Sequence, residues 1–109
     1  MITTLNALAE SNRLHIVELL RENPHSVNEI ASQLHLSQPL VSKHLRVLSE
    51  AGLVKVRPNA QQRIYQLEAT PFENLNSWLE TFRRVWNDRL DTLDEYMQEL
   101  KTHPKQDKE

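Results

Sequence analysis

The 109-residue sequence predicts one mostly α-helical domain that carries a single β-hairpin. The chain has one glycine and five prolines, so few residues interrupt its helices. Apolar residues recur every three or four positions through most of the chain, which is the helical period. Between residues 53 and 67 this spacing gives way to two short β-branched runs. At this length we expect one hydrophobic core.

Two helices are expected before Pro24. A short helix covers residues 4–9, and a longer helix covers residues 12–21, with Ser11 as its N-cap and Asn23-Pro24 as its stop. The longer helix carries apolar residues at helical spacing, namely Leu14, Ile16, Val17, Leu19 and Leu20.

The next two helices are short and closely spaced. Ser26 and Glu29 form a capping box, in which each side chain accepts a hydrogen bond from the other residue's backbone amide, so a helix begins near Val27. Ser37 is the N-cap of a helix over residues 38–51, which Gly52 ends. The buried faces of the pair hold Ile30, Ala31, Leu34, Val41, Leu45 and Leu48. Two short helices joined by a tight turn indicate a helix-turn-helix.

A β-hairpin follows the second motif helix. Its two strands are marked by the apolar runs Leu53, Val54 and Val56, and Ile64, Tyr65 and Leu67. The polar residues 58–61 connect them. A hairpin in this position completes a winged helix-turn-helix, with the hairpin as the wing.

A long helix is expected after the hairpin. Thr70-Pro71-Phe72-Glu73 is a capping box with proline at the first helical position. From Phe72 to Leu100 apolar residues recur at three and four, and Trp78, Val85 and Tyr96 widen the stripe. A helix of about 30 residues is about 45 Å long, more than a 70-residue domain can cover, so we expect a second copy of the chain to cover part of it. We expect residues 1–101 to form the domain and residues 102–109 a polar, disordered tail.

The positive charge of the chain is concentrated in its middle third. The net charge is −2 overall, but it is −2 for residues 1–37, +3 for residues 38–70 and −3 for residues 71–109. A basic block between acidic flanks is compatible with a surface that faces phosphates. A solvated charged surface is the alternative reading of the same pattern.

The second motif helix turns a polar and cationic face outward, which suits DNA. Glutamine can pair with an adenine edge, lysine and arginine can reach guanine or phosphate, and the helix N-terminus can bind a phosphate. Hairpin cations can contact the flanking backbone or the minor groove, although charged edge strands also prevent aggregation. We expect DNA contacts from Ser37, Gln38, Pro39, Ser42, Lys43, His44 and Arg46 on the helix, and from Arg57, Gln62 and Arg63 on the hairpin.

The sequence offers no chemistry typical of an enzyme or a cofactor protein. Zero cysteines exclude thiolate metal sites and cysteine nucleophiles, and one glycine excludes a glycine-rich phosphate loop. The histidines are scattered, so we expect neither a metal nor a cofactor. No apolar run is long enough to span a membrane and the first ten residues do not resemble a leader peptide, so we expect a cytoplasmic protein.

These residues resemble the ArsR/SmtB family of winged-helix repressors. The likeness rests on Ala7-Leu8-Ala9, on Asn12-Arg13-Leu14 with Ile16, and most specifically on the segment from Ser37-Gln38-Pro39-Leu40-Val41-Ser42-Lys43-His44-Leu45 to Ala51-Gly52-Leu53-Val54. It covers residues 5 to about 67. The resemblance implies a homodimer through the first and last helices, with the second motif helix in the major groove of a short palindromic operator. For this chain it implies an interface of Leu5, Leu8, Phe72, Leu75, Leu79, Phe82, Trp86, Leu90, Leu93 and Met97.

The chain departs from the metal-sensing members of that family. Their Cys-x-Cys pattern is replaced by Ser26 and Asn28, and their Asp-x-His pattern by Asp91 and Leu93. His103 also lacks the glutamate that should follow it. The chain therefore resembles the cysteine-free subgroup without a metal inducer, and its inducing signal is not specified.

The sequence predicts a sequence-specific, DNA-binding transcriptional regulator, and the resemblance implies a repressor that binds its operator as a homodimer. The alternative is a winged-helix module that keeps the fold but uses the hairpin or the long helix to bind another protein. An enzyme would need a convergent polar pocket, which these residues do not supply.

Overall fold

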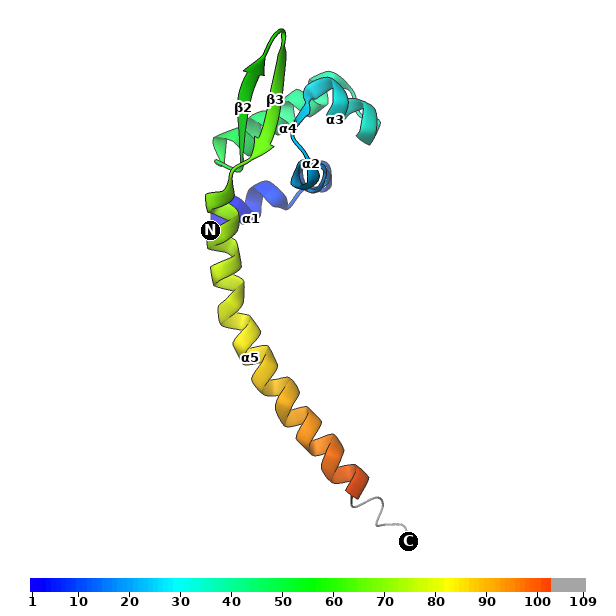
Figure 1. Cartoon of the computed structure of the whole chain (residues 1–109), viewed down its shortest axis with the longest axis vertical. Helices are drawn as coiled ribbons and strands as arrows, with labels where there is room; N and C mark the ends of the chain where they lie inside the picture. Colours follow the sequence, from blue (N-terminus) through cyan, green and yellow to red (C-terminus); the bar gives the residue numbers. More distant parts are fainter. Residues whose placement is uncertain (103–109) are drawn as a thin grey trace. The chain divides into compact units, whose positions relative to one another are not determined.

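The computed structural model describes residues 1–102. It divides into two compact units, Met1–Leu75 and the part of the chain that begins at Asn76. The elements are α1 (Ile2–Leu8), α2 (Ser11–Glu22), β1 (His25–Ser26), α3 (Val27–Leu34), α4 (Gln38–Glu50), β2 (Val54–Asn59), β3 (Gln62–Leu67) and α5 (Ala69–Thr102). Figure 1 labels all of them except the short β1. The predicted class, mostly α-helical with a winged helix-turn-helix, is confirmed. Within residues 1–102 no helix is both long and apolar enough to cross a membrane.

The helix-turn-helix begins and ends as the sequence predicts. Both hydrogen bonds of the capping box are present, with Ser26 N donating to Glu29 Oε1 at 2.8 Å and Glu29 N donating to Ser26 Oγ at 3.2 Å. Ser37 Oγ accepts from Leu40 N at 3.3 Å at the start of α4. Gly52 follows α4 with φ +80°, a left-handed conformation that glycine adopts without steric cost. The two helices are therefore positioned by local hydrogen bonds.

The predicted N-cap of α2 was wrong. Ser11 is the first residue of α2, and the N-cap is Glu10, whose Oε1 accepts from Arg13 N at 2.8 Å. Arg13 in turn donates from Nε to the carbonyl oxygen of Ala7 at 2.6 Å and from its guanidinium to that of Asn6 at 3.3 Å. These bonds join the end of α1 to the start of α2.

The core of the first unit lies between the helices and the base of the hairpin. Its side chains from α3 and α4 are those that the helical period predicts, and Val41, Leu45 and Leu48 are fully buried. Leu53 and Val54 close the core beneath the hairpin. Because α4 uses one face for this core, its opposite face remains at the surface.

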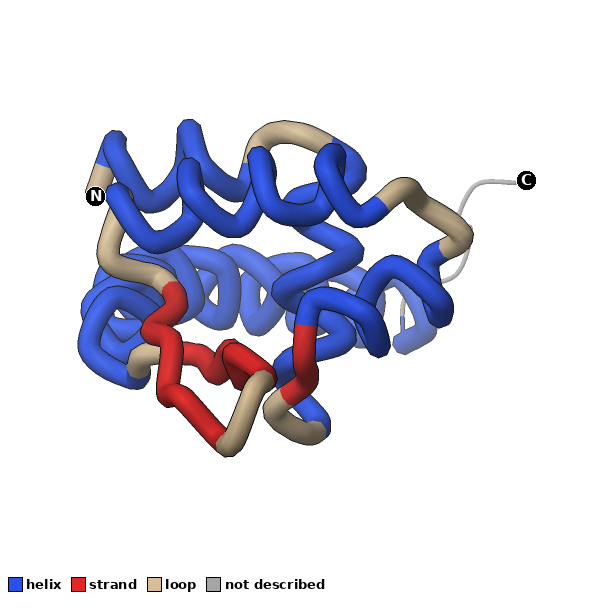
Figure 2. Tube along the Cα trace, turned by 90° about the horizontal axis from the view of Figure 1, so that it is seen from above, coloured by secondary structure: helices blue, strands red, loops and turns tan. Residues whose placement is uncertain are grey.

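The sheet has three strands rather than the predicted two. Their order is β1-β3-β2, and His25 and Ser26 of β1 pair with Tyr65 and Ile64 of β3. Figure 2 shows this short strand, in red, beside the hairpin. The predicted four-residue connection was also wrong, because Pro58 and Asn59 belong to β2 and only residues 60–61 form the turn.

The last helix begins earlier than predicted. α5 starts at Ala69, so Thr70 and Pro71 lie inside its first turn and Thr70 is not the N-cap. The helix ends at Thr102. The rest of the predicted tail, residues 103–109, lies outside the described residues.

Candidate nucleic-acid interface

The outward face of α4 carries the polar and cationic residues that the helical period predicts. Gln38, Pro39, Ser42, Lys43 and Arg46 are all exposed, and so is Ser37 at the N-cap. The first turn of α4 contains no acidic residue. This face therefore presents amide, hydroxyl and cationic groups together, the types that contact base edges and phosphates.

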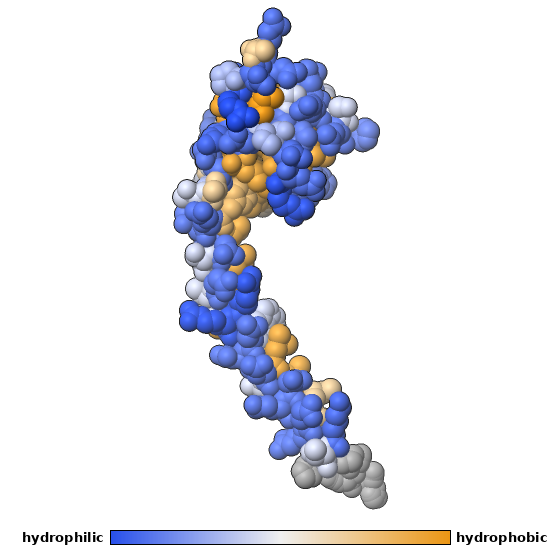
Figure 3. Space-filling view, viewed as in Figure 1, coloured by the Kyte–Doolittle hydropathy of each residue, from blue (hydrophilic) through white to orange (hydrophobic). Residues whose placement is uncertain are grey.

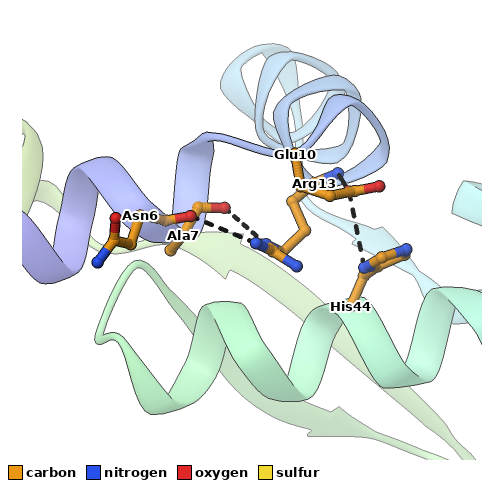
Figure 4. Close-up of polar contacts among 5 residues, drawn as sticks. All are labelled: Asn6, Ala7, Glu10, Arg13 and His44. Atoms are coloured by element: carbon orange, nitrogen blue, oxygen red, sulfur yellow. Dashed lines mark hydrogen bonds and ion pairs between the residues drawn. The ribbon is translucent and has the colours of Figure 1, made fainter.

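His44 is not part of that face. Only 8% of the residue is exposed, and its imidazole lies between α4 and the corner of α1 and α2 (Figure 4). Nδ1 lies 3.8 Å from Glu10 Oε1, and no hydrogen bond to Nδ1 is present among the described residues. The prediction that His44 contacts DNA was wrong, because its side chain packs inward beside Val41, Leu45 and Leu48.

Glu10 remains ionised at this corner. The hydrogen bond from the backbone amide of Arg13 lowers the pKa of the Glu10 carboxyl, and the proximity of His44 acts in the same direction. The carboxylate therefore performs two tasks: it caps α2 and it faces the imidazole of α4.

The predicted hairpin residues divide between two faces of the sheet. Directly paired residues share a face, so Arg57, paired with Ile64, lies on the same face as Gln62, paired with Asn59. Arg63, paired with Pro58, lies on the other face, with Val54 and Leu67 further down the strands. Arg57, Gln62 and Arg63 are all exposed.

Arg63 lies near the start of α3. A hollow of about 190 Å³ separates the hairpin tip from that helix and is lined by Ser26, Val27, Asn28, Gln61, Gln62 and Arg63. Sequence reasoning did not associate Asn28 with the hairpin, because their proximity depends on the pairing of β1 with β3. The signal in the sequence was the polar character of Asn28 itself, two positions after the Ser26 cap and so in the first turn of α3.

The exposed cations of α4 and of the outer part of the hairpin have no acidic partner in the described part of the chain. Within residues 1–102, Lys43, Arg46, Arg57 and Arg63 make no ion pair within 4.0 Å. Lys55, nearer the base of the hairpin, differs because its Nζ lies 3.7 Å from Glu68 Oε1. The four unpaired cations are therefore available to an anionic partner.

A second histidine–carboxylate contact supports the start of α3. His25 Nδ1 lies 3.4 Å from Glu29 Oε1, the oxygen that also accepts from Ser26 N. That backbone hydrogen bond, aided by His25, lowers the pKa of the Glu29 carboxyl. Glu29 thereby joins β1, which holds the wing, to the first motif helix.

The predicted dimer residues are of two kinds. Leu5, Leu8, Phe72 and Leu75 are half-buried, and Leu8 and Phe72 pack against the core of their own domain. The remaining ones lie on α5 and are exposed: Leu79, Phe82, Trp86, Leu90, Leu93 and Met97. In the space-filling view orange side chains follow one side of α5 (Figure 3). No group of three potential ligands for a metal occurs among residues 1–102.

Known proteins share this fold and this sequence pattern. The model of a family described as bacterial regulatory protein, arsR family, matches residues 10–56. The HTH-type transcriptional regulator Rv2034 of Mycobacterium tuberculosis is 45% identical over 70% of this chain and 71% of its own length. The structure of HlyU from Vibrio cholerae, named a transcriptional activator, is 37% identical with a TM-score of 0.64 and covers 74% of this chain and 88% of its own.

A more distant match has the same fold. The homodimeric winged helix-turn-helix DNA-binding domain Mb0332 from Mycobacterium bovis has a TM-score of 0.64 at 24% identity. The match covers 76% of this chain and 77% of that domain.

Proposed function

Because the chain belongs to the ArsR family of bacterial regulatory proteins, we propose that it is a homodimeric regulator that represses transcription by binding a palindromic operator. The observation that supports a DNA surface is the exposed face of α4, whose cations make no ion pair within residues 1–102. The protein acts in the cytoplasm. When it occupies the operator, it keeps the transcription machinery from that DNA.

The two elements divide the recognition of DNA. Gln38 and Ser42 project from the first turns of α4 and read base edges in the major groove. Lys43 and Arg46 reach both bases and phosphates. Ser37 already accepts from Leu40 N with its hydroxyl, and Pro39 has no backbone N–H. Ser37 therefore fixes the start of α4, where the amide of Gln38 can face a phosphate.

The wing anchors the protein beside the groove that α4 enters. Arg57 and Gln62 lie on one face of the hairpin and Arg63 on the other, so the hairpin presents a cation to each side. Phosphate contacts of this kind fix the position of a protein on the duplex without reading its sequence.

The dimer doubles this surface. Two copies related by a two-fold axis bind two half-sites about one helical turn of DNA apart, which makes the operator an inverted repeat. The exposed apolar residues of α5 supply the surface between the copies. The Mb0332 domain, which has the same fold, is homodimeric, and this supports the assignment.

Selection of bound fragments from random duplexes tests the proposal. We expect enrichment of an inverted repeat with half-site centres about 10 base pairs apart. Four free cations in each copy predict a slope of up to about −7 in a plot of log affinity against log salt concentration. If no sequence is enriched and binding to any duplex is insensitive to salt, the chain is a protein-interaction module.

The regulatory output needs a separate measurement. A reporter gene placed behind the selected sequence should be less active when the protein is present than when it is absent. Higher expression with the protein present would instead assign activation, the role named for the related HlyU.

A further inference from the structure

The first unit contains an apolar hollow where three elements meet. Its volume is about 490 Å³, and it lies between α2, the end of β3 and the first turn of α5. Its apolar lining consists of Val17, Leu67, Ala69 and Phe72. Val17 belongs to the buried core, and Leu67 and Phe72 pack against that core while they remain partly exposed. All of the lining lies within Met1–Leu75, so the hollow belongs to one compact unit.

The size and lining of the hollow suit a small molecule. Pockets that bind small ligands typically have volumes of about 300–1,000 Å³ and are lined mostly by apolar and aromatic side chains, with a few polar groups. This hollow has both properties. An aromatic ring or a short alkyl chain placed in it would be removed from water against Val17 and Phe72.

The charges around the hollow favour a cation. They come from Glu18 and Arg21 of α2 and from Glu68 before α5, and their net charge is −1. A guanidinium nitrogen of Arg21 lies 4.0 Å from Glu22 Oε2. Glu68 Oε1 lies 3.7 Å from Lys55 Nζ. Glu18 is exposed and makes no ion pair with another residue of the described chain, so the unpaired charge beside the apolar lining is a carboxylate.

We propose that this hollow binds a small organic cation, a molecule with an apolar body that ends in an ammonium group, and that this ligand weakens operator binding. The ammonium lies beside the Glu18 carboxylate, and the body lies against Val17 and Phe72. The face of an aromatic ring also attracts a cation, so Phe72 favours the same charge as Glu18. The part of this inference that concerns the operator rests on the proposed function.

The position of the hollow connects such a ligand to both functional elements. Leu67 ends β3, a strand of the wing, and Ala69 begins α5, the helix whose exposed apolar residues are assigned to the dimer. Only Glu68 separates them, and its backbone amide donates to the carbonyl oxygen of Leu53 at 2.9 Å. A ligand between α2 and this junction therefore acts on the wing and on the start of the dimer helix. Coupling between two sites requires an element that both of them influence.

Three probes with the same body test the charge preference. Phenylbutylamine, phenylbutanol and phenylbutyrate end in an ammonium, a hydroxyl and a carboxylate, and each is titrated at neutral pH into the nitrogen-15-labelled full chain. We expect NMR shifts of the amides of Val17, Glu18 and Phe72, with the amine binding most tightly and the carboxylate least. An exposed ion pair predicts about a two- to fivefold difference in affinity between the amine and the alcohol.

Two variants locate the site. Glu18→Gln should remove the preference for the amine over the alcohol and leave the affinity for the alcohol unchanged. Ala69→Trp should block all three probes, because it fills the hollow from an exposed position at the start of α5. The matched control is Thr70→Trp, at an exposed neighbouring position outside the lining, which should bind the probes as the parent does.

Operator affinity gives the second readout. Saturating amine should weaken binding of the selected operator at least about fivefold. The operator should weaken amine binding by the same factor, because the coupling between two ligands is reciprocal. Ala69→Trp, which cannot take up the amine, controls for direct effects of the amine on DNA. Equal operator affinity with and without the amine would overturn the regulatory role of the hollow.

The outcomes separate this inference from the proposed function. Equal or tighter binding of the carboxylate probe, shifts confined to residues outside the lining, or no binding of any probe would each overturn the inference. Operator binding by the parent chain would then leave the proposed function intact. If Ala69→Trp converts a dimer into a monomer in sedimentation, a second copy of the chain occupies the hollow and the inference fails. Amine binding by a chain that binds no operator would keep the site and reject the proposed function.

Discussion

Nδ1 of His44 lies 3.8 Å from Oε1 of Glu10, which places an imidazole of α4 against the carboxylate that caps α2. The pair joins the helix with the exposed cationic face to the corner where α1 meets α2. Nδ1 is buried, and no partner within hydrogen-bond distance is present in the described chain. A buried polar atom without a partner costs about 1–3 kcal/mol.

That cost leads to a prediction about two substitutions. His44→Leu should leave the free energy of unfolding unchanged or raise it by up to about 1 kcal/mol, because it fills the space and removes the unpaired nitrogen. His44→Ala should lower it by about 1–3 kcal/mol, because it leaves a cavity. Urea denaturation of both variants measures this, with exposed Lys43→Ala as the control. If His44→Leu loses as much as His44→Ala, the imidazole makes a favourable polar contact with Glu10.

Gln38 and Ser42 should determine which base pairs are preferred. Changing either to alanine is expected to weaken binding to the selected operator by roughly 1–3 kcal/mol and to relax preference at particular positions. Fluorescence anisotropy with the operator and single-base variants of it measures both effects. Ser49→Ala, an exposed serine near the other end of α4, is the matched control. Parent-like discrimination by both variants would show that α4 does not read the sequence.

Arg63 should behave as an anchor instead. Arg63→Ala is expected to weaken binding to all duplexes by a similar factor and to reduce the salt slope by about two per dimer, because each copy loses one phosphate contact. Arg21→Ala is the control, since it removes an exposed cation from α2, where Arg21 lies 4.0 Å from Glu22. A salt slope unchanged by Arg63→Ala would exclude Arg63 from the DNA surface.

Glu29 should make the stability of the fold depend on pH in the acidic range. Its folded-state pKa is lowered below the ordinary value of 4.5, chiefly by the hydrogen bond from Ser26 N. The ionised carboxylate therefore stabilises the fold above pH 4.5, and this stabilisation is lost as the pH falls through the lowered pKa. Glu29→Gln should have a lower Tm than the parent at neutral pH, and the difference should shrink as the pH falls below 4.5. Thermal melts beside Glu18→Gln, an exposed carboxylate of α2, measure it; a difference independent of pH would contradict this.

Metal ions should leave operator binding unchanged. The chain has no cysteine, and Ser26, Asn28 and Leu93 stand where metal-sensing relatives place ligands. Titration of the protein–operator complex with stoichiometric zinc, cadmium or arsenite should give the same affinity as the chelator-treated sample. A tenfold or larger change would reveal a metal site in the chain.

Local signals predicted the helix-turn-helix, and contacts between distant segments account for the errors. The caps at Ser26 and Ser37 depend on residues three positions away, which the sequence displays. The two residues of β1 have no pattern of their own and become a strand only by pairing with β3. Pro58 suggested a turn, but β2 is an edge strand, where a proline without a backbone N–H is tolerated.

The errors at the candidate site have a similar origin. Glutamate is a less common N-cap than serine, which favoured Ser11 over Glu10. The burial of His44 had a signal in the sequence, because it lies three positions after Val41 and four before Leu48, on the same helical face. A histidine in a cationic segment suggested an outward position instead. Which face of the hairpin Arg57 and Arg63 occupy follows from the register, which the turn length sets.

The pairing of β1 with β3 makes the wing part of the same small sheet as the residues that begin α3. This pairing restrains the hairpin, so its distance from α4 is set by the fold. A duplex must match that dimension between its neighbouring grooves or deform to do so, at a cost that depends on its stiffness. We therefore expect the base pairs between the α4 and hairpin contacts to influence affinity through their stiffness, although no side chain touches them.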